Sequence, residues 1–192
     1  MRDDIVARLR DATGEAHQRL ETRLDIIRRV SSPGGRRALV ERFYGLHEGA
    51  ERSLAPLLDP VADLAFPKRR RAPTILDDLA ALGRDDFKPL PVCSVEPPGS
   101  SAEAMGFFYV LEGSTLGGKM IRRELEARGL PGTGLAFLDP YGAETGERWR
   151  AFLAVLRREC PDGHGQAGNE MVAGSVRAFR QAESWLCPTE AA

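Results

Sequence analysis

The first residues that could do chemistry are a histidine, a carboxylate and an arginine near the N-terminus. Glu21 follows His17 by four residues, and Arg10 precedes His17 by seven. At the helical period these side chains lie along one edge of the same helix. A histidine in that position can be a metal ligand, and a carboxylate one turn away can orient its imidazole. The alternative is a surface histidine paired with a helical glutamate, and the spacing alone leaves both interpretations open.

A second candidate stretch, Phe107 to Ile121, places glycines inside what reads as one helix. Gly113, Gly117 and Gly118 lie within it, and Gly106 precedes it. Each glycine costs a helix about 1 kcal/mol relative to alanine. Four of them therefore cost roughly 4 kcal/mol, against a typical domain stability of about 5–15 kcal/mol. One explanation is the close approach of another helix, for which glycines four apart are a weak signal. The other is a flat ligand lying against bare backbone, with the glycines also letting the helix bend.

The composition fits one globular domain that spans residues 1–192. The chain is 42% hydrophobic and 29% charged, and its net charge is -1. This charge predicts no nucleic-acid partner, because nucleic-acid-binding domains carry a basic field. The one dense basic run, residues 68–71, stands between two prolines and is interpreted as a solvated loop.

Membrane and redox signals are also missing from the sequence. No apolar stretch approaches the length of a membrane span, and the N-terminus has no apolar core of a signal peptide. We therefore expect no membrane association. The three cysteines are odd in number and widely spread, which predicts neither a disulfide framework nor a metal cluster. A cytoplasmic location is the simplest expectation.

Apolar residues recur at steps of three and four along most of the chain, which predicts an all-α fold. Residues 84–99 are proline-rich and are expected to form a loop over the surface. Residues 135–138 are interpreted as a buried linker. His47 is expected at the edge of the core or on the surface, and His164 is expected in an exposed turn. The predicted helices cover residues 3–29, 33–58, 74–82, 100–128, 146–160 and 166–186.

Two motifs together resemble those of the haem oxygenase family. The residues from Leu9 to Glu21 are similar to the proximal helix of that family, with its Leu-Arg, Thr, His and Glu in order. The residues from Tyr109 to Gly118 are similar to its distal helix in the bacterial form. The last two predicted helices also lie where the family has them, so the similarity spans most of the chain. The resemblance implies a single-domain, haem-oxygenase-like helical bundle with a glycine-kinked distal helix.

The resemblance also assigns roles to individual residues. His17 would be the axial ligand of the haem iron, and Glu21 would hold it through the free ring nitrogen. Gly113 and Gly117 would press bare backbone against the opposite face of the haem and leave room for O2. Gly118 would complete the bend of the helix.

Further family positions are matched less uniformly. Arg10 and Arg150 match basic positions that can bind the haem propionates. Phe179 would be either pocket wall or ordinary core. Ser114 stands where many animal members have an aspartate and could join a water chain, which puts the route of proton delivery in doubt. Gly14 replaces one basic position that faces the haem in other members.

The implied reaction opens haem, as both cofactor and substrate, to biliverdin, CO and ferrous iron at the expense of O2 and electrons. The sequence has no flavin or nicotinamide fingerprint, so an external donor of the ferredoxin or flavin-reductase type would supply the electrons. One rival function is a haem carrier or sensor without turnover, which Ser114 keeps open. The other is a helical interaction module that does not bind haem. Iron acquisition and the supply of biliverdin to a bacterial phytochrome are both open as purposes.

Overall fold

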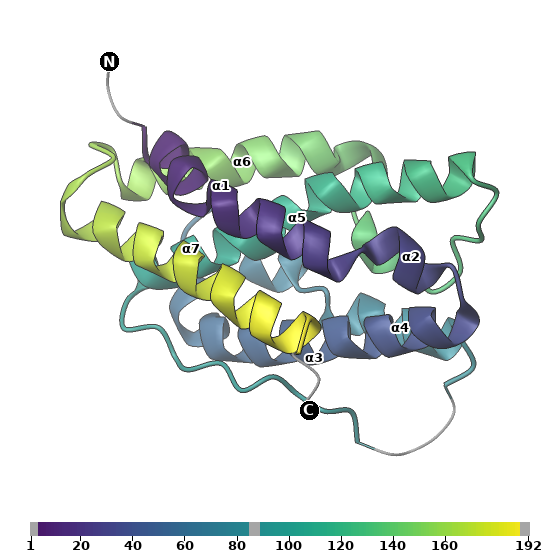
Figure 1. The fold of residues 1–192 in the computed structure, drawn as a ribbon. Coiled ribbons are helices and arrows are strands. Elements are labelled where there is room, and N and C mark those ends of the chain that lie inside the picture. Colours follow the sequence, from purple (N-terminus) through teal and green to yellow (C-terminus); the bar gives the residue numbers. More distant parts are fainter. Residues whose placement is uncertain (1–3, 85–88, 189–192) are drawn as a thin grey trace.

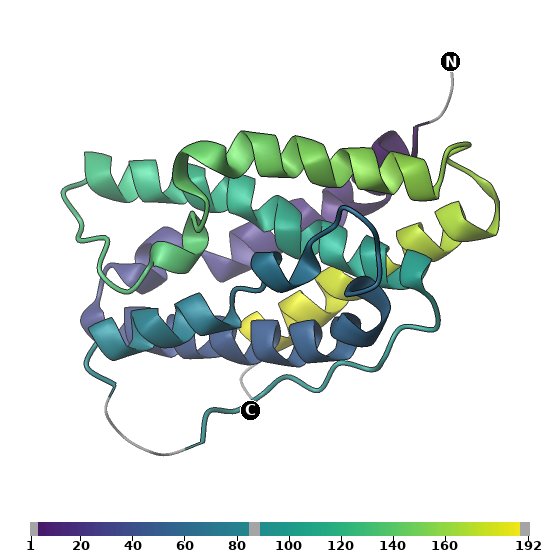
Figure 2. The same ribbon diagram turned by 180° about the vertical axis from the view of Figure 1, so that it is seen from behind.

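The computed structural model describes residues 4–84 and 89–188, and every regular element within these ranges is a helix. This confirms the predicted all-α class. Figure 1 shows α1 and α7 in front of the long helix α5, and Figure 2 shows α6 and α4 on the other side. The α-helices are α1 (Ile5–Leu24), α2 (Ile26–Val30), α3 (Pro33–Leu58), α4 (Ala72–Ala81), α5 (Ser101–Ala127), α6 (Thr145–Glu159) and α7 (Gly165–Leu186). Three short 3₁₀ turns join them: η1 (Phe66–Arg69), η2 (Ala136–Leu138) and η3 (Gly142–Glu144).

The predicted first helix is wrong in its extent. The helix begins at Ile5, where the Asp4 side chain accepts a hydrogen bond from the Val6 amide, and residue 3 lies outside the described residues. It ends at Leu24, because Asp25 adopts a left-handed conformation with φ 40°. Aspartate tolerates this conformation better than most residues. The chain then continues as the separate short helix α2.

The ends of the glycine-rich helix α5 follow the sequence signals. The Ser100 hydroxyl accepts from the Glu103 amide at 3.1 Å, and the Glu103 carboxylate accepts from the Gly99 amide at 2.7 Å. At the other end Gly129 has φ 67°, and the Leu130 amide donates to the Leu125 carbonyl, as in a Schellman motif. Between these caps the glycines leave the α-helical pattern uninterrupted.

The core is built around α5. Its apolar face packs on α7, α3 and α6, while α1 rests on α7 and α6. The largest buried side chains of this core include Leu9, Leu54, Phe107 and Phe152. Residues 135–138 form η2, in which Phe137 and Leu138 are buried, so the predicted buried linker is confirmed. None of the described helices is long and apolar enough to cross a membrane.

Candidate functional site

The proximal candidates lie on the open side of α1. His17 Nδ1 is 3.5 Å from Glu21 Oε2, and the two side chains are 57% and 66% exposed. With Nδ1 directed at the carboxylate, Nε2 is the ring nitrogen left to bind a metal. An exposed pair of this kind contributes little to stability. The exposure and the spacing fit both interpretations raised by the sequence, and the role of His17 as a ligand stays a prediction.

Phe179 of α7 contacts the imidazole ring of His17. Its ring centroid is 5.8 Å from that of His17, and the planes meet at 75°, an edge-to-face contact. Phe179 is itself buried. Its burial confirms a core residue, and its role as pocket wall stays a prediction.

The four glycines of α5 divide into two pairs. A Cβ added at Gly106 would overlap the Met171 carbonyl, and one at Gly118 would overlap the Leu138 carbonyl. These two glycines therefore serve close packing. A Cβ at Gly117 would meet no neighbouring atom within 4 Å in the described chain, and one at Gly113 would meet only the Trp149 indole, at 3.4 and 3.6 Å.

The two explanations raised by the sequence apply to different glycines: close packing explains Gly106 and Gly118, and it does not explain Gly117. A helical interaction module would bury Gly113 and Gly117 against protein, and the described chain does not do so at Gly117. For Gly118, contact with the Leu138 backbone explains the missing side chain, and a role in bending the helix stays a prediction.

The open glycines share their side of α5 with exposed apolar residues. Leu116 is 39% exposed and Met120 is 63% exposed, and both follow Gly113 and Gly117 at helical spacing. Apolar side chains of this size are usually covered when they lie side by side. A flat apolar ligand would cover them while resting on the bare backbone, so the residues present fit haem.

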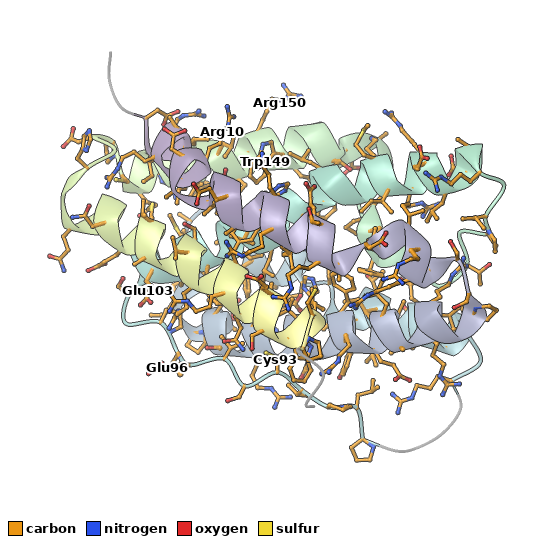
Figure 3. All side chains as sticks on the ribbon, viewed as in Figure 1. Arg10, Cys93, Glu96, Glu103, Trp149 and Arg150 are labelled. Atoms are coloured by element: carbon orange, nitrogen blue, oxygen red, sulfur yellow. The ribbon has the colours of Figure 1, made fainter. Side chains whose placement is uncertain are left out.

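An aromatic and basic cluster stands at one end of this surface. The Tyr109 and Trp149 ring centroids are 5.5 Å apart. Burial raises the pKa of Tyr109, and the charge of Arg10 opposes this shift, which places Arg10 close to that phenol. Arg150 is exposed on α6, and its Nε donates to the Gly146 carbonyl at 3.2 Å. In Figure 3 Arg10, Trp149 and Arg150 are labelled close together along the upper side of the bundle.

Ser114 is an exposed residue of α5 whose hydroxyl has two fixed partners. Its Oγ accepts from Arg71 at 3.0 Å and donates to the Leu111 carbonyl at 2.7 Å. The hydroxyl is therefore oriented by the protein at the edge of the open surface. Arg71 itself is buried, and burial lowers its pKa while the nearby Glu112 raises it.

His47 is buried in the core, which corrects its expected position at the core edge or the surface. It is 2% exposed, and its Nδ1 is 3.0 Å from Glu51 Oε1. The Glu51 carboxylate also accepts from the amides of Arg71 and Ala72, at 2.7 and 3.2 Å, and thereby caps α4. Burial and the Arg71 charge lower the pKa of His47, so this histidine is neutral.

The interpretation of the basic run 68–71 as a solvated loop is wrong, because two of its four side chains are buried. Arg69 and Arg71 are 5% and 4% exposed. Their partners are Glu112 and Ser114 of α5, 43 residues further along the chain in both cases. In the sequence, four consecutive basic residues do not indicate that Arg69 and Arg71 point into the core. A signal was available in Glu112, which lies in the apolar part of the glycine-rich helix. A buried carboxylate needs a buried cation as its partner.

Comparison with known proteins shows the family and the fold of the chain. The model of the family described as heme oxygenase matches residues 3–186. A curated heme oxygenase from Xanthomonas campestris pv. campestris (strain 8004) is 34% identical over 150 residues, which cover 73% of this chain and 82% of the relative. The solved NO- and CO-bound heme oxygenase from Neisseria meningitidis superposes with a TM-score of 0.75 over 98% of this chain and 95% of that one. At 20% identity, this last likeness supports the fold alone. An all-helical chain with this family match and this relative belongs to the haem (heme) oxygenase family.

Proposed function

We propose that His17 binds the iron of haem and that Gly113 and Gly117 form the facing wall of the site. As a member of its family, the enzyme degrades haem with O2 and a reductant, and haem is both substrate and prosthetic group. The products are biliverdin, CO and ferrous iron. The observation that carries the residue assignment is the empty space beside Gly117 on an apolar, exposed side of α5.

Bound haem supplies the iron chemistry, and the surrounding residues orient the ring and supply protons. Glu21 holds the imidazole of His17 through Nδ1. Arg10 and Arg150 bind the propionates, since charge-assisted hydrogen bonds to carboxylates are strong. Phe179 restricts the histidine ring. Leu116 covers the apolar part of the haem ring. This residue was not among those expected from the sequence.

Ser114 would act as a proton donor, or would hold a water molecule that donates, when haem is bound. Its hydroxyl is fixed between the Arg71 guanidinium and the Leu111 carbonyl, so a water at Ser114 Oγ would have a defined position. This arrangement supports catalysis without the aspartate found in many animal members. It thereby weakens the rival function of a haem carrier or sensor without turnover.

Electrons come from an external donor of the ferredoxin or flavin-reductase type in this proposal. The family match supports a reductant as partner, and the type of donor is the proposed part. Iron acquisition and biliverdin supply to a bacterial phytochrome remain the two purposes proposed. A cytoplasmic location is proposed from the three free cysteines, which are all buried.

A pair of glycine variants tests the proposed site. Gly117→Leu fills the open side of α5, whereas Gly34→Leu fills equally open space on α3, away from the site. Both remove a helical glycine, and each should raise the stability by up to about 1 kcal/mol. We expect Gly117→Leu alone to lose haem binding, measured by spectral titration, and with it biliverdin formation.

The outcome can be read without ambiguity because both variants are expected to fold. Thermal unfolding of the free proteins checks this first. If Gly117→Leu bound and degraded haem as well as Gly34→Leu does, the haem would lie elsewhere and the assignment of Gly113 and Gly117 would be wrong.

A further inference from the structure

Glu112 is the most deeply buried acidic residue described, with 1% exposure, and it stands directly before the open glycine Gly113. Its carboxylate has a partner on each oxygen. Arg69 Nη1 donates to Oε1 in a buried ion pair, and the Tyr141 hydroxyl donates to Oε2 at 3.1 Å. Burial and the adjacent carboxylate raise the pKa of Tyr141, so it remains a protonated donor.

Each partner of Glu112 belongs to a different connecting segment. Arg69 ends η1, where its Nε donates to the Leu64 carbonyl at 2.8 Å and its guanidinium also reaches the Arg148 carbonyl at 3.3 Å. Tyr141 belongs to the connection between α5 and α6. Glu112 therefore links two segments to a single point on α5. One segment contains η1 and precedes α5 in the chain, and the other connects α5 to α6.

The connection between α5 and α6 is attached at two more points of the same helix. Lys119 Nζ donates to the Gly142 carbonyl at 2.7 Å, and the bare Cα of Gly118 lies against the Leu138 carbonyl. The helix is thus held along residues 112–119 on its buried side. Its other side over the same turns carries Gly113 and Gly117 and faces no protein at Gly117.

A buried ion pair contributes little net stability, because the desolvation of both charges offsets their attraction. What it provides is a defined geometry, and for α5 that geometry is the rotation about the helix axis. On a helix with a Cα radius of about 2.3 Å, a rotation of about 20° moves a Cα by about 0.8 Å. A misplacement of about 1 Å at a reacting centre can cost about a hundredfold in rate.

We propose that Glu112 is a positioning residue that fixes the rotation of α5, and with it the distance of the bare backbone at Gly113 and Gly117 from the haem. The proposal rests on the proposed function of those two glycines. Glu112 does not touch the substrate. It acts through the backbone of its own helix, and it sets which edge of the haem the distal wall crowds.

Three variants test this role. Glu112→Gln keeps the shape of the side chain and removes its charge, and Tyr141→Phe removes only the hydroxyl. Glu124→Gln is the matched control, because Glu124 forms an exposed ion pair with Arg128 on the same helix. The measurements are amide hydrogen exchange of residues 113–119 in the free protein, then kcat, KM and the biliverdin isomers formed.

We expect Glu112→Gln to exchange these amides faster than the wild type and to lower kcat by about tenfold to a hundredfold with KM little changed. It should also broaden the mixture of biliverdin isomers, which loss of stability alone would not do. Tyr141→Phe should show the same changes at smaller size, and Glu124→Gln should show none.

Equal exchange and equal isomer composition in Glu112→Gln and Glu124→Gln would overturn the proposal. If Glu112→Gln failed to fold, Tyr141→Phe would carry the test, because it keeps the Arg69 pair intact, and wild-type behaviour of Tyr141→Phe would then reject the role. If the wild type formed no biliverdin, the proposed function would fail, and the exchange comparison would still decide whether Glu112 positions α5.

Discussion

Burial sets the chemistry of the two helical histidines, His17 and His47. Both have a glutamate one turn further along their helix, at Glu21 and Glu51. The first pair is more than half exposed, and the second is almost fully buried. The same local motif therefore gives an accessible ring nitrogen in α1 and a neutral, hydrogen-bonded core residue in α3.

The buried His47 predicts a specific loss of stability in mild acid. Its pKa is lowered in the folded state from the ordinary value of 6.5. The unfolded chain therefore binds a proton at a pH where the folded protein does not, so stability falls as the pH falls through about 6.5. Between pH 7.5 and 5.5 this single group should remove up to about 1.4 kcal/mol from the free energy of unfolding.

Urea unfolding at the two pH values measures this effect. In His47→Gln the pH dependence over this range should shrink, although the variant is less stable throughout. An unchanged slope in His47→Gln would mean that another group titrates.

At the scale of the element, α5 is exposed on one side and fastened on the other. The side chains of Ser114 and Thr115 donate to the carbonyls three residues before them, at 2.7 and 2.8 Å. Bonds of this type bend helices. Arg71 joins them by donating to the Leu111 carbonyl. The turn next to the site is thus shaped by hydroxyl groups as well as by glycines.

Removing one of these hydroxyls should separate haem binding from turnover. Ser114→Ala leaves Arg71 with one hydrogen bond fewer, at a cost of about 1 kcal/mol in stability. Haem should bind with wild-type affinity, because His17 and the glycines are unchanged. Biliverdin formation should slow by about tenfold or more, since a positioned proton carrier is lost.

Single-turnover kinetics with a chemical reductant check this prediction. Thr22→Ala is a control, because the Thr22 hydroxyl bonds its own helix backbone at an exposed position in α1. If Ser114→Ala degraded haem at the wild-type rate, proton delivery would not pass through this hydroxyl.

The sequence signals were sufficient to predict where α5 and α3 begin and end, but they did not predict where α1 ends. Ser100 and Ser32 cap their helices as their types predict, and Gly129 ends α5. No proline or glycine marks the break at Asp25. It depends on one residue in the left-handed region, which local propensity does not distinguish from a helical aspartate.

At the scale of the whole molecule, the proposed site takes its residues from helices that are distant in the chain. α1 brings His17 and Arg10, α5 brings the glycines, and Trp149 and Arg150 come from α6. The resemblance of two motifs was enough to predict that α1 and α5 contribute to one site. The buried charges could not be found in that way, because Arg69 and Glu112 are 43 residues apart and neither is part of a periodic pattern of its own.

The overall arrangement also explains why the open surface persists. α1 packs on α7 and α6, so it stays beside α5 without covering Gly117. Both helices are stabilised by the core beneath them, and of the proposed site residues only Phe179 and Gly118 are buried. The site residues are therefore free to be selected for chemistry.

The most direct test of the whole account is a haem titration of the wild type and of His17→Ala, followed by ascorbate in air with catalase present. For the wild type the account predicts a sharp Soret band at one haem per chain, which decays into the spectrum of biliverdin. His17→Ala should lose the spectrum of the axially ligated complex and its turnover. The account would be contradicted by a wild type without specific haem binding, or by His17→Ala with the native haem spectrum.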